Sequence, residues 1–115
     1  MKYLIMIYAS EAEEAKMSPA QIGEVLQAYG AYSEALAKSG VLVGADRLRP
    51  TSEATSVRVR AGKTEVLNGP YAETREQLGG YYLIDVPDLD AALSWAARCP
   101  SSSYGTIEVR PIWTM

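Results

Sequence analysis

The sequence predicts an α+β sandwich of ferredoxin-like topology, with two helices packed on one face of a mainly antiparallel sheet. A strand, an amphipathic helix and a second strand follow one another near the start of the chain, and the same order returns near its end. A stretch with the alternation of a β-hairpin lies between these two units. Since the chain has 115 residues, we expect one domain spanning 1–115.

The first unit begins with residues 3–8, which are apolar without strict alternation, as in a strand covered on both faces. The segment 18–21, Ser-Pro-Ala-Gln, predicts a helix start, because serine caps, proline suits the first turn and glutamine completes a capping box. Apolar side chains then recur at helical spacing until Gly40, so residues 19–38 predict one amphipathic helix. The strand 41–44 follows at once and completes the unit.

The middle of the chain predicts a hairpin and then a polar excursion. Residues 55–60 alternate cleanly, Gly62 supplies a turn and residues 64–67 return, which predicts a hairpin with one solvent-facing side. Asn68-Gly69-Pro70 breaks the second strand, and Gly79-Gly80 closes an excursion of about ten residues.

The second unit resumes with a strand at 81–86. Asp88 caps a helix with apolar residues on one face, and Pro100 ends it. Residues 106–110 alternate as the last strand. The chain therefore offers only two helices of useful length to cover its sheet.

The bare sheet face predicts a homodimer. Apolar residues point to both faces of the strands near 3–8 and 81–86, while the two helices cover only one face. A second copy of the chain is the simplest cover, which predicts a dimeric α/β barrel.

Composition excludes several classes of function. The chain has no His, so an imidazole base, a His-dependent nucleophile and a His-ligated metal are excluded, and we expect no metal and no cofactor. The single Cys99 excludes an intrachain disulfide and fits a reducing compartment, so we expect a cytoplasmic protein. A net charge of −3 with scattered arginines argues against nucleic acid, and the apolar start is too short for a signal segment or a membrane span.

The segment 68–82 is the most unusual stretch of the sequence. The Asn-Gly-Pro turn would hold Tyr71 and Glu73 in defined directions, as in a binding loop. The alternative is that the turn ends the hairpin, Tyr71 packs on the core, and Glu73 and Arg75 form a solvated pair of little energetic weight.

This segment, with its continuation through 83–90 and 108–111, resembles the YCII-related proteins of the DGPF type, named for an Asp-Gly-Pro-Phe motif. The resemblance covers nearly the whole chain. It implies a ferredoxin-like fold and a dimeric α/β barrel. Genes of DGPF-type proteins commonly lie beside those of extracytoplasmic-function sigma factors, so the resemblance also implies a role in transcriptional regulation.

The motif maps onto this sequence with two departures. Gly69 and Pro70 match, while Asn68 replaces the aspartate and Tyr71 replaces the phenylalanine. Asparagine keeps the turn-forming ability of aspartate and loses its charge. The acidic residue after the aromatic is Glu73, and Arg75 represents the usual lysine.

The wider YCII family is described with a His-Asp pair, the histidine on the first helix and the aspartate before the proline that ends the second. In this sequence Tyr29 and Cys99 stand at about these two positions. Neither group ionises usefully at neutral pH without a large pKa shift, so the inherited acid–base pair is absent.

Two functional hypotheses remain. The first is a binding or regulatory domain with a small-molecule cleft between sheet and helices, although its tyrosines could equally be core residues. The second is a small lyase or isomerase in which a desolvated Glu73 is the general base and Tyr71 or Tyr104 the acid; Cys99 as nucleophile is a weaker variant. The candidate ligand contacts are Tyr29, Asn68, Tyr71, Arg75, Tyr81, Tyr104 and Arg110, with Glu73 as a further polar anchor.

Overall fold

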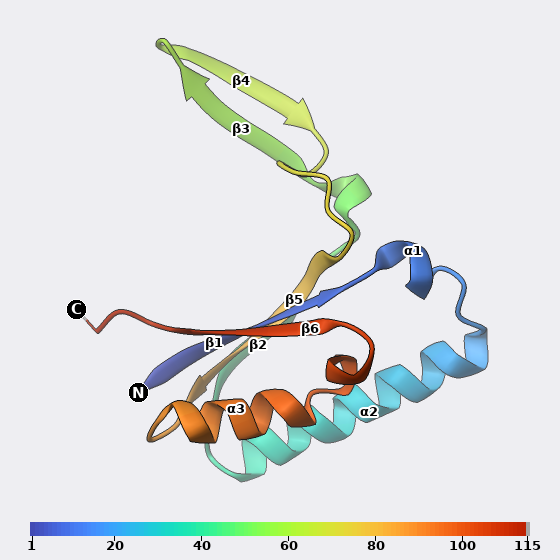
Figure 1. The fold of residues 1–115 in the computed structure, drawn as a ribbon, viewed down its shortest axis with the longest axis vertical. Coiled ribbons are helices and arrows are strands. Elements are labelled where there is room, and N and C mark those ends of the chain that lie inside the picture. Colours follow the sequence, from blue (N-terminus) through green and yellow to red (C-terminus); the bar gives the residue numbers. More distant parts are fainter. Residues whose placement is uncertain (115) are drawn as a thin grey trace.

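The computed structural model describes residues 1–114 and contains a four-stranded antiparallel sheet in the order β2-β5-β1-β6 (Figure 1). The expected fold class is confirmed, with β1 in the interior of the sheet between β5 and β6. The strands are β1 (Lys2–Ala9), β2 (Leu42–Arg47), β3 (Thr55–Arg60), β4 (Lys63–Asn68), β5 (Gln77–Asp85) and β6 (Thr106–Pro111). The helices are α1 (Glu11–Glu14), α2 (Pro19–Lys38) and α3 (Leu89–Arg98), with 3₁₀ turns at Thr51–Glu53 and Pro100–Ser103.

Both long helices begin where their capping residues predict. The Ser18 hydroxyl accepts a hydrogen bond from the Gln21 backbone N–H at 3.2 Å, and the Gln21 side chain accepts one from the Ser18 N–H at 2.9 Å. The Asp88 carboxylate accepts from the Ala91 N–H at 2.9 Å and caps α3 in the same way. The short α1, capped by Ser10, was not predicted from the sequence.

The core lies between the sheet and the helices α2 and α3. Ile5 of β1, Ile84 of β5 and Leu36 of α2 are fully buried there. Tyr32 packs its ring edge-on against Tyr82, with ring centroids 5.2 Å apart, and its hydroxyl donates to the Trp95 carbonyl at 2.7 Å. Because the Tyr32 hydroxyl is hydrogen-bonded, its burial in the core leaves no unsatisfied polar group.

The opposite face of the sheet has no helix on it in Figure 1, in which α2 and α3 both lie on the same side of the strands. Along β1 and the second half of β5, the residues of this face alternate with the buried core residues and are half-buried. The register places Leu4 beside Leu83 and Met6 beside Tyr81. We call this surface, with Arg110 and Glu108 from β6, the open sheet face.

The glycine pair at 79–80 differs from its predicted role as a break, because β5 runs through both residues. A side chain at Gly80 would bring a Cβ to 2.9 Å from the Asp46 carbonyl oxygen of the neighbouring β2. Glycine therefore permits the close approach of the two strands here.

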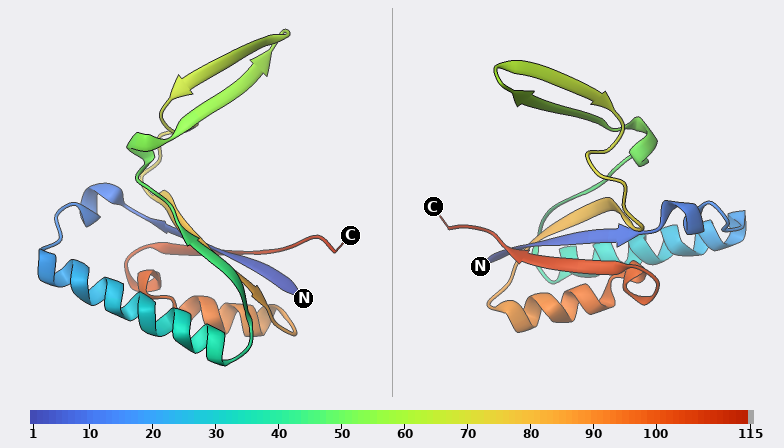
Figure 2. Two further views of the ribbon diagram at one scale, coloured as in Figure 1. Left: turned by 180° about the vertical axis from the view of Figure 1, so that it is seen from behind. Right: turned by 45° about the horizontal axis from the view of Figure 1, so that its top comes forward.

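The β3–β4 hairpin forms at the predicted place but stands apart from the four-stranded sheet (Figure 2). The sequence predicts one solvent-facing side, whereas both sides of the hairpin are largely exposed in the structure. Alternation along a strand specifies which residues share a face, and it does not specify what covers that face.

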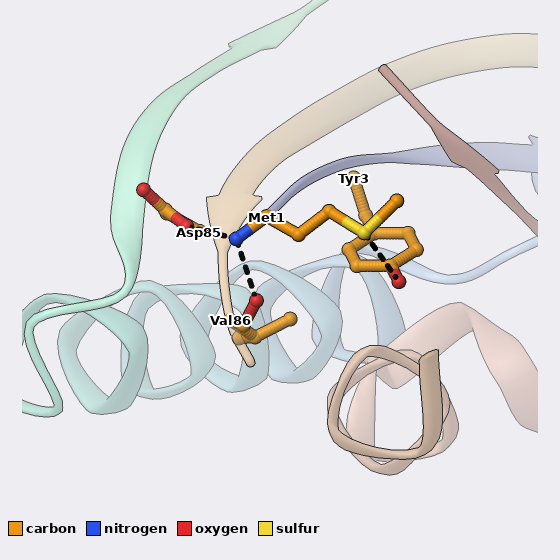
Figure 3. Close-up of polar contacts among 4 residues, drawn as sticks. All are labelled: Met1, Tyr3, Asp85 and Val86. Atoms are coloured by element: carbon orange, nitrogen blue, oxygen red, sulfur yellow. Dashed lines mark hydrogen bonds and ion pairs between the residues drawn. The ribbon is translucent and has the colours of Figure 1, made fainter. Parts of the chain in front are cut away.

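The start of β1 is fixed to the end of β5 by its terminal amine (Figure 3). The Met1 nitrogen donates to the Asp85 carboxylate at 2.8 Å and to the Val86 carbonyl at 2.9 Å. The hydrogen bond and positive charge of this amine lower the pKa of the Asp85 carboxyl group. No helix within residues 1–114 combines the length and apolarity that a bilayer crossing requires.

Candidate functional site

Three hydroxyl groups and one thiol meet where the middle of α2 faces the turn that follows α3. The Tyr29 hydroxyl is hydrogen-bonded to the Ser101 hydroxyl and lies 3.5 Å from the Cys99 sulfur. The Ser101 hydroxyl in turn lies 3.1 Å from the Tyr104 hydroxyl. We call Tyr29, Cys99, Ser101 and Tyr104 the hydroxyl cluster.

Local sequence signals explain how the turn presents these groups. Pro100 ends α3 and begins the 3₁₀ turn Pro100–Ser103, which directs Ser101 inward, so that Ser101 is only 3% exposed. Gly105 then allows the turn to pack on β1, because a Cβ at this position would overlap the Tyr8 carbonyl oxygen. The cluster therefore depends on a proline and a glycine that flank the serine.

The titratable groups of the cluster are held in their neutral forms. Burial raises the pKa of the Tyr29 hydroxyl, and the hydrogen bond with Cys99 raises it further. Burial likewise raises the pKa of the Cys99 thiol, although its hydrogen bond with Tyr29 acts in the opposite direction. At neutral pH the cluster therefore offers neutral hydrogen-bond donors and acceptors, and neither group is poised as a base or a nucleophile.

A gradient of exposure runs through the cluster. Ser101 and Cys99 are buried, Tyr29 is half-buried, and Tyr104 is 43% exposed. Tyr104 is therefore the most exposed member of the cluster, and a contact with its hydroxyl would extend the hydrogen bonds of the buried groups.

The loop that begins with the Asn68-Gly69-Pro70 turn, which we call the motif loop, lies apart from the hydroxyl cluster. Tyr71 is 81% exposed and Glu73 and Arg75 are exposed, and within residues 1–114 no ion pair joins Glu73 to Arg75. Tyr71 is thus not a core residue. A groove of about 600 Å³ runs beside the loop and is lined by Asn68 and Glu73 among others.

Two further candidate ligand contacts lie on the open sheet face. The Tyr81 hydroxyl donates to the Asp46 carboxylate at 2.6 Å, and this hydrogen bond raises the pKa of Tyr81. Arg110 lies 2.7 Å from the Glu108 carboxylate in an exposed ion pair. The predicted cleft lined by Tyr29, Tyr71, Tyr81 and Tyr104 therefore does not form in the structure, because these side chains occupy three separate places.

Ser101 is the member of the cluster that sequence reasoning missed. It is the first of three consecutive serines in a predicted loop, and local sequence gives no indication of which serine points inward. Its only signal is the preceding Cys-Pro pair, which places it two residues after Cys99, the position that the family resemblance implicates.

Cys99 gives a prediction on pH. Because burial raises its pKa in the folded state, its contribution to stability is complete below the unfolded thiol pKa of about 8.5 and declines as the pH rises above that value. Tyr29 begins to contribute in the same direction only above about pH 10. We expect Cys99→Ser, which cannot titrate here, to lose less stability between pH 8 and 10 than the unaltered protein. Urea unfolding across this range measures the difference; equal pH slopes would contradict the raised thiol pKa.

Figure 1 and the strand order define the class of protein: a ferredoxin-like α+β domain with its two long helices on one side of the sheet. The family model of the YCII-related domain matches residues 1–115. An uncharacterized protein of Rhizobium meliloti (strain 1021) is 38% identical over 114 residues, which cover 97% of this chain and 92% of that protein. The chain belongs to the YCII-related family.

Membership in this family gives a context for the hydroxyl cluster. The two positions at which the resemblance implies a His-Asp pair are Tyr29 and Cys99, and they are in contact in the structure. The fold therefore brings these two side chains together, although neither is a residue of the pair that the resemblance implies. Among the described residues, no group of three His, Cys, Asp or Glu side chains could hold a metal ion.

Proposed function

We propose that this protein is a homodimeric domain whose hydroxyl cluster binds a neutral polar small molecule. The observation that carries the proposal is the linked set of Tyr29, Ser101 and Tyr104 hydroxyls, which leads from a buried serine to an exposed tyrosine. Hydroxyl groups can donate and accept, so the cluster is suited to a ligand with hydroxyl, amide or carbonyl groups.

The protonation of the cluster favours binding over acid–base catalysis. Raised pKa values keep Tyr29 and Cys99 neutral, so a charged ligand would find no counter-charge among the four residues of the cluster. The alternative of a lyase or isomerase required a desolvated Glu73, and an exposed Glu73 in the motif loop disfavours it. A ligand-binding role also suits the regulation linked to sigma-factor transcription control that the DGPF resemblance implies.

The surface of the protomer supports the dimer. The protomer exposes 8093 Å², against about 6,200 Å² expected for a compact monomer of its mass. Its radius of gyration is 16.1 Å, against about 13 Å for a compact chain of this length. An excess of about 1,900 Å² per protomer is of the size that an obligate dimer interface buries. We assign this interface to the open sheet face, where Leu4, Met6 and Leu83 are half-buried and no helix covers them.

Ligand-dependent melting tests the binding proposal. We expect at least one member of a panel of neutral polar compounds to raise the melting temperature by several degrees at a concentration of about 100 times its dissociation constant. Tyr29→Phe and Ser101→Ala should abolish this shift, because each removes one hydroxyl of the cluster.

Tyr71→Phe is the matched control, since it removes a hydroxyl from an exposed tyrosine outside the cluster. It should leave the shift unchanged. Circular dichroism checks that each variant is folded. A panel without any shift, or a shift lost in Tyr71→Phe and kept in Tyr29→Phe, would refute binding at the cluster.

A further inference from the structure

The β3–β4 hairpin has two faces of different chemistry. The register pairs Val57 with Val66 and Val59 with Thr64, so three valines share one face that carries no charge. The other face carries the charged residues, including the Arg58–Glu65 ion pair of 2.8 Å. The uncharged face, which we call the valine face, consists of Thr55, Val57, Val59, Thr64, Val66 and Asn68.

The valine face is unusual because this protomer leaves it uncovered. Val57, Val59 and Val66 are all more than half exposed. Two hydrogen bonds close the open end of the hairpin: the Gly69 N–H donates to the Ala54 carbonyl at 2.7 Å, and the Ser56 hydroxyl donates to the Gly69 carbonyl at 2.9 Å. Both join one strand to the other and cover neither face of the hairpin. An isolated two-stranded hairpin is marginally stable in water, so the valine face needs a partner surface.

The position of the hairpin indicates which surface this is. In Figures 1 and 2 the hairpin rises from the sheet on the side away from α2 and α3, which is the side of the open sheet face. A second copy seated on the open sheet face would therefore stand directly beside the hairpin. Two-fold symmetry would then place both hairpins against the opposite protomers.

The charge of the hairpin also favours a second copy of the chain as its partner. Arg58, Arg60 and Lys63 against Glu65 leave the hairpin with a net charge of about +2, while the whole chain carries −3. The remainder of the chain is therefore acidic, with a net charge of about −5. A basic hairpin is attracted to the acidic body of a second copy, and this adds electrostatic complementarity to the apolar contact.

We propose that the β3–β4 hairpin is an intersubunit arm, whose valine face packs on the body of the partner protomer. This inference rests on the dimer proposed above and adds a second contact to the one between the open sheet faces. It also explains the large surface and radius of the protomer, because an arm that projects from the body is compact only within the dimer.

Two neighbouring residues of β4 provide a matched test. Val66 and Leu67 are both exposed in the protomer, at 62% and 46%, and they lie on opposite faces of the hairpin. Val66→Lys and Leu67→Lys add the same charge to the same strand. We expect Val66→Lys to raise the dimer dissociation constant at least tenfold, and Leu67→Lys to change it less than threefold, as measured by sedimentation equilibrium on the full chain.

A second variant controls for the possibility that lysine weakens the dimer by destabilising the hairpin itself. Val57→Thr with Val66→Thr keeps the β-branched shape of both side chains and makes the valine face polar. It should also weaken the dimer by at least tenfold, and hydrogen exchange of the hairpin amides should become faster.

The outcomes separate the arm from the dimer. If all three variants dimerise as tightly as the unaltered protein, the valine face is not buried by a second copy, and the arm is refuted while the dimer stands. Equal weakening by Val66→Lys and Leu67→Lys would likewise refute a contact specific to the valine face. If the unaltered protein is a monomer at micromolar concentration, the dimer fails and the arm fails with it.

Discussion

Replacing Gly105 by alanine is expected to lower the free energy of unfolding by about 3 kcal/mol and to disrupt the hydroxyl cluster. A Cβ at this position would overlap the Tyr8 carbonyl oxygen and would lie 3.2 Å from the Ser101 carbonyl oxygen. Both obstacles are backbone atoms, so a side-chain rotation cannot relieve the overlap. Either the turn Pro100–Ser103 or the end of β1 has to move.

The turn is the part expected to yield, because β1 is paired with a neighbouring strand on each side, β5 and β6, whereas the turn is an irregular segment outside the sheet. The Gly105 N–H donates to the Ser101 carbonyl at 2.7 Å, and the Tyr104 N–H donates to the same oxygen at 3.3 Å. Displacement of the turn would separate Ser101 from Tyr29 and expose Cys99. We therefore expect Cys99 in Gly105→Ala to react with a thiol reagent much faster than in the unaltered protein.

Gly44→Ala is the control, because a Cβ at Gly44 would meet no atom within 4 Å. It should change the free energy of unfolding by less than about 1 kcal/mol. Urea unfolding and thiol labelling at neutral pH measure both effects. Equal stability of the two alanine variants would contradict the close packing of the turn on β1.

Local signals in the sequence predict most of the elements. The capping box at Ser18 and Gln21 and the cap at Asp88 act within one helical turn, so the starts of α2 and α3 can be read from the sequence. The role of Gly80 could not, since glycine has the same local preference in a turn and in a strand that passes close to its neighbour. The relation of the hairpin to the sheet is a long-range property that alternation along the strand does not contain.

In the candidate site, too, some features could be predicted from the sequence and others depend on tertiary packing. Tyr29 and Cys99 were implicated by the resemblance to a family, and the structure brings them within 3.5 Å although 70 positions separate them. Residues predicted to bind a ligand because of their amino-acid type were less informative. Tyr71 is an exposed loop residue, and Tyr81 lies on the face of the sheet opposite to the core. Amino-acid type indicates what a side chain can do, while tertiary packing decides which side chains it meets.

Leu83→Asp is expected to convert the dimer proposed above into a folded monomer. Leu83 lies beside Leu4 on the open sheet face and is half-buried in the protomer, so an aspartate there can reach water when the protomer is alone. In a two-fold dimer through this face, the substitution is present in both protomers, and two carboxylates would be buried near the interface without partners. Each buried and unpaired charge costs several kcal/mol, which is enough to dissociate the dimer at micromolar concentration.

Leu89→Asp provides the matched control, because Leu89 is an exposed leucine at the first position of α3, away from the open sheet face. An acidic residue is favourable at a helix N-terminus, so this variant should be as stable as the unaltered protein and should remain a dimer. Sedimentation velocity distinguishes a monomer of 12.5 kDa from a species of twice that mass. A dimer of unchanged affinity in Leu83→Asp would rule out an interface that buries this part of the open sheet face, because burial of the two carboxylates carries a desolvation penalty.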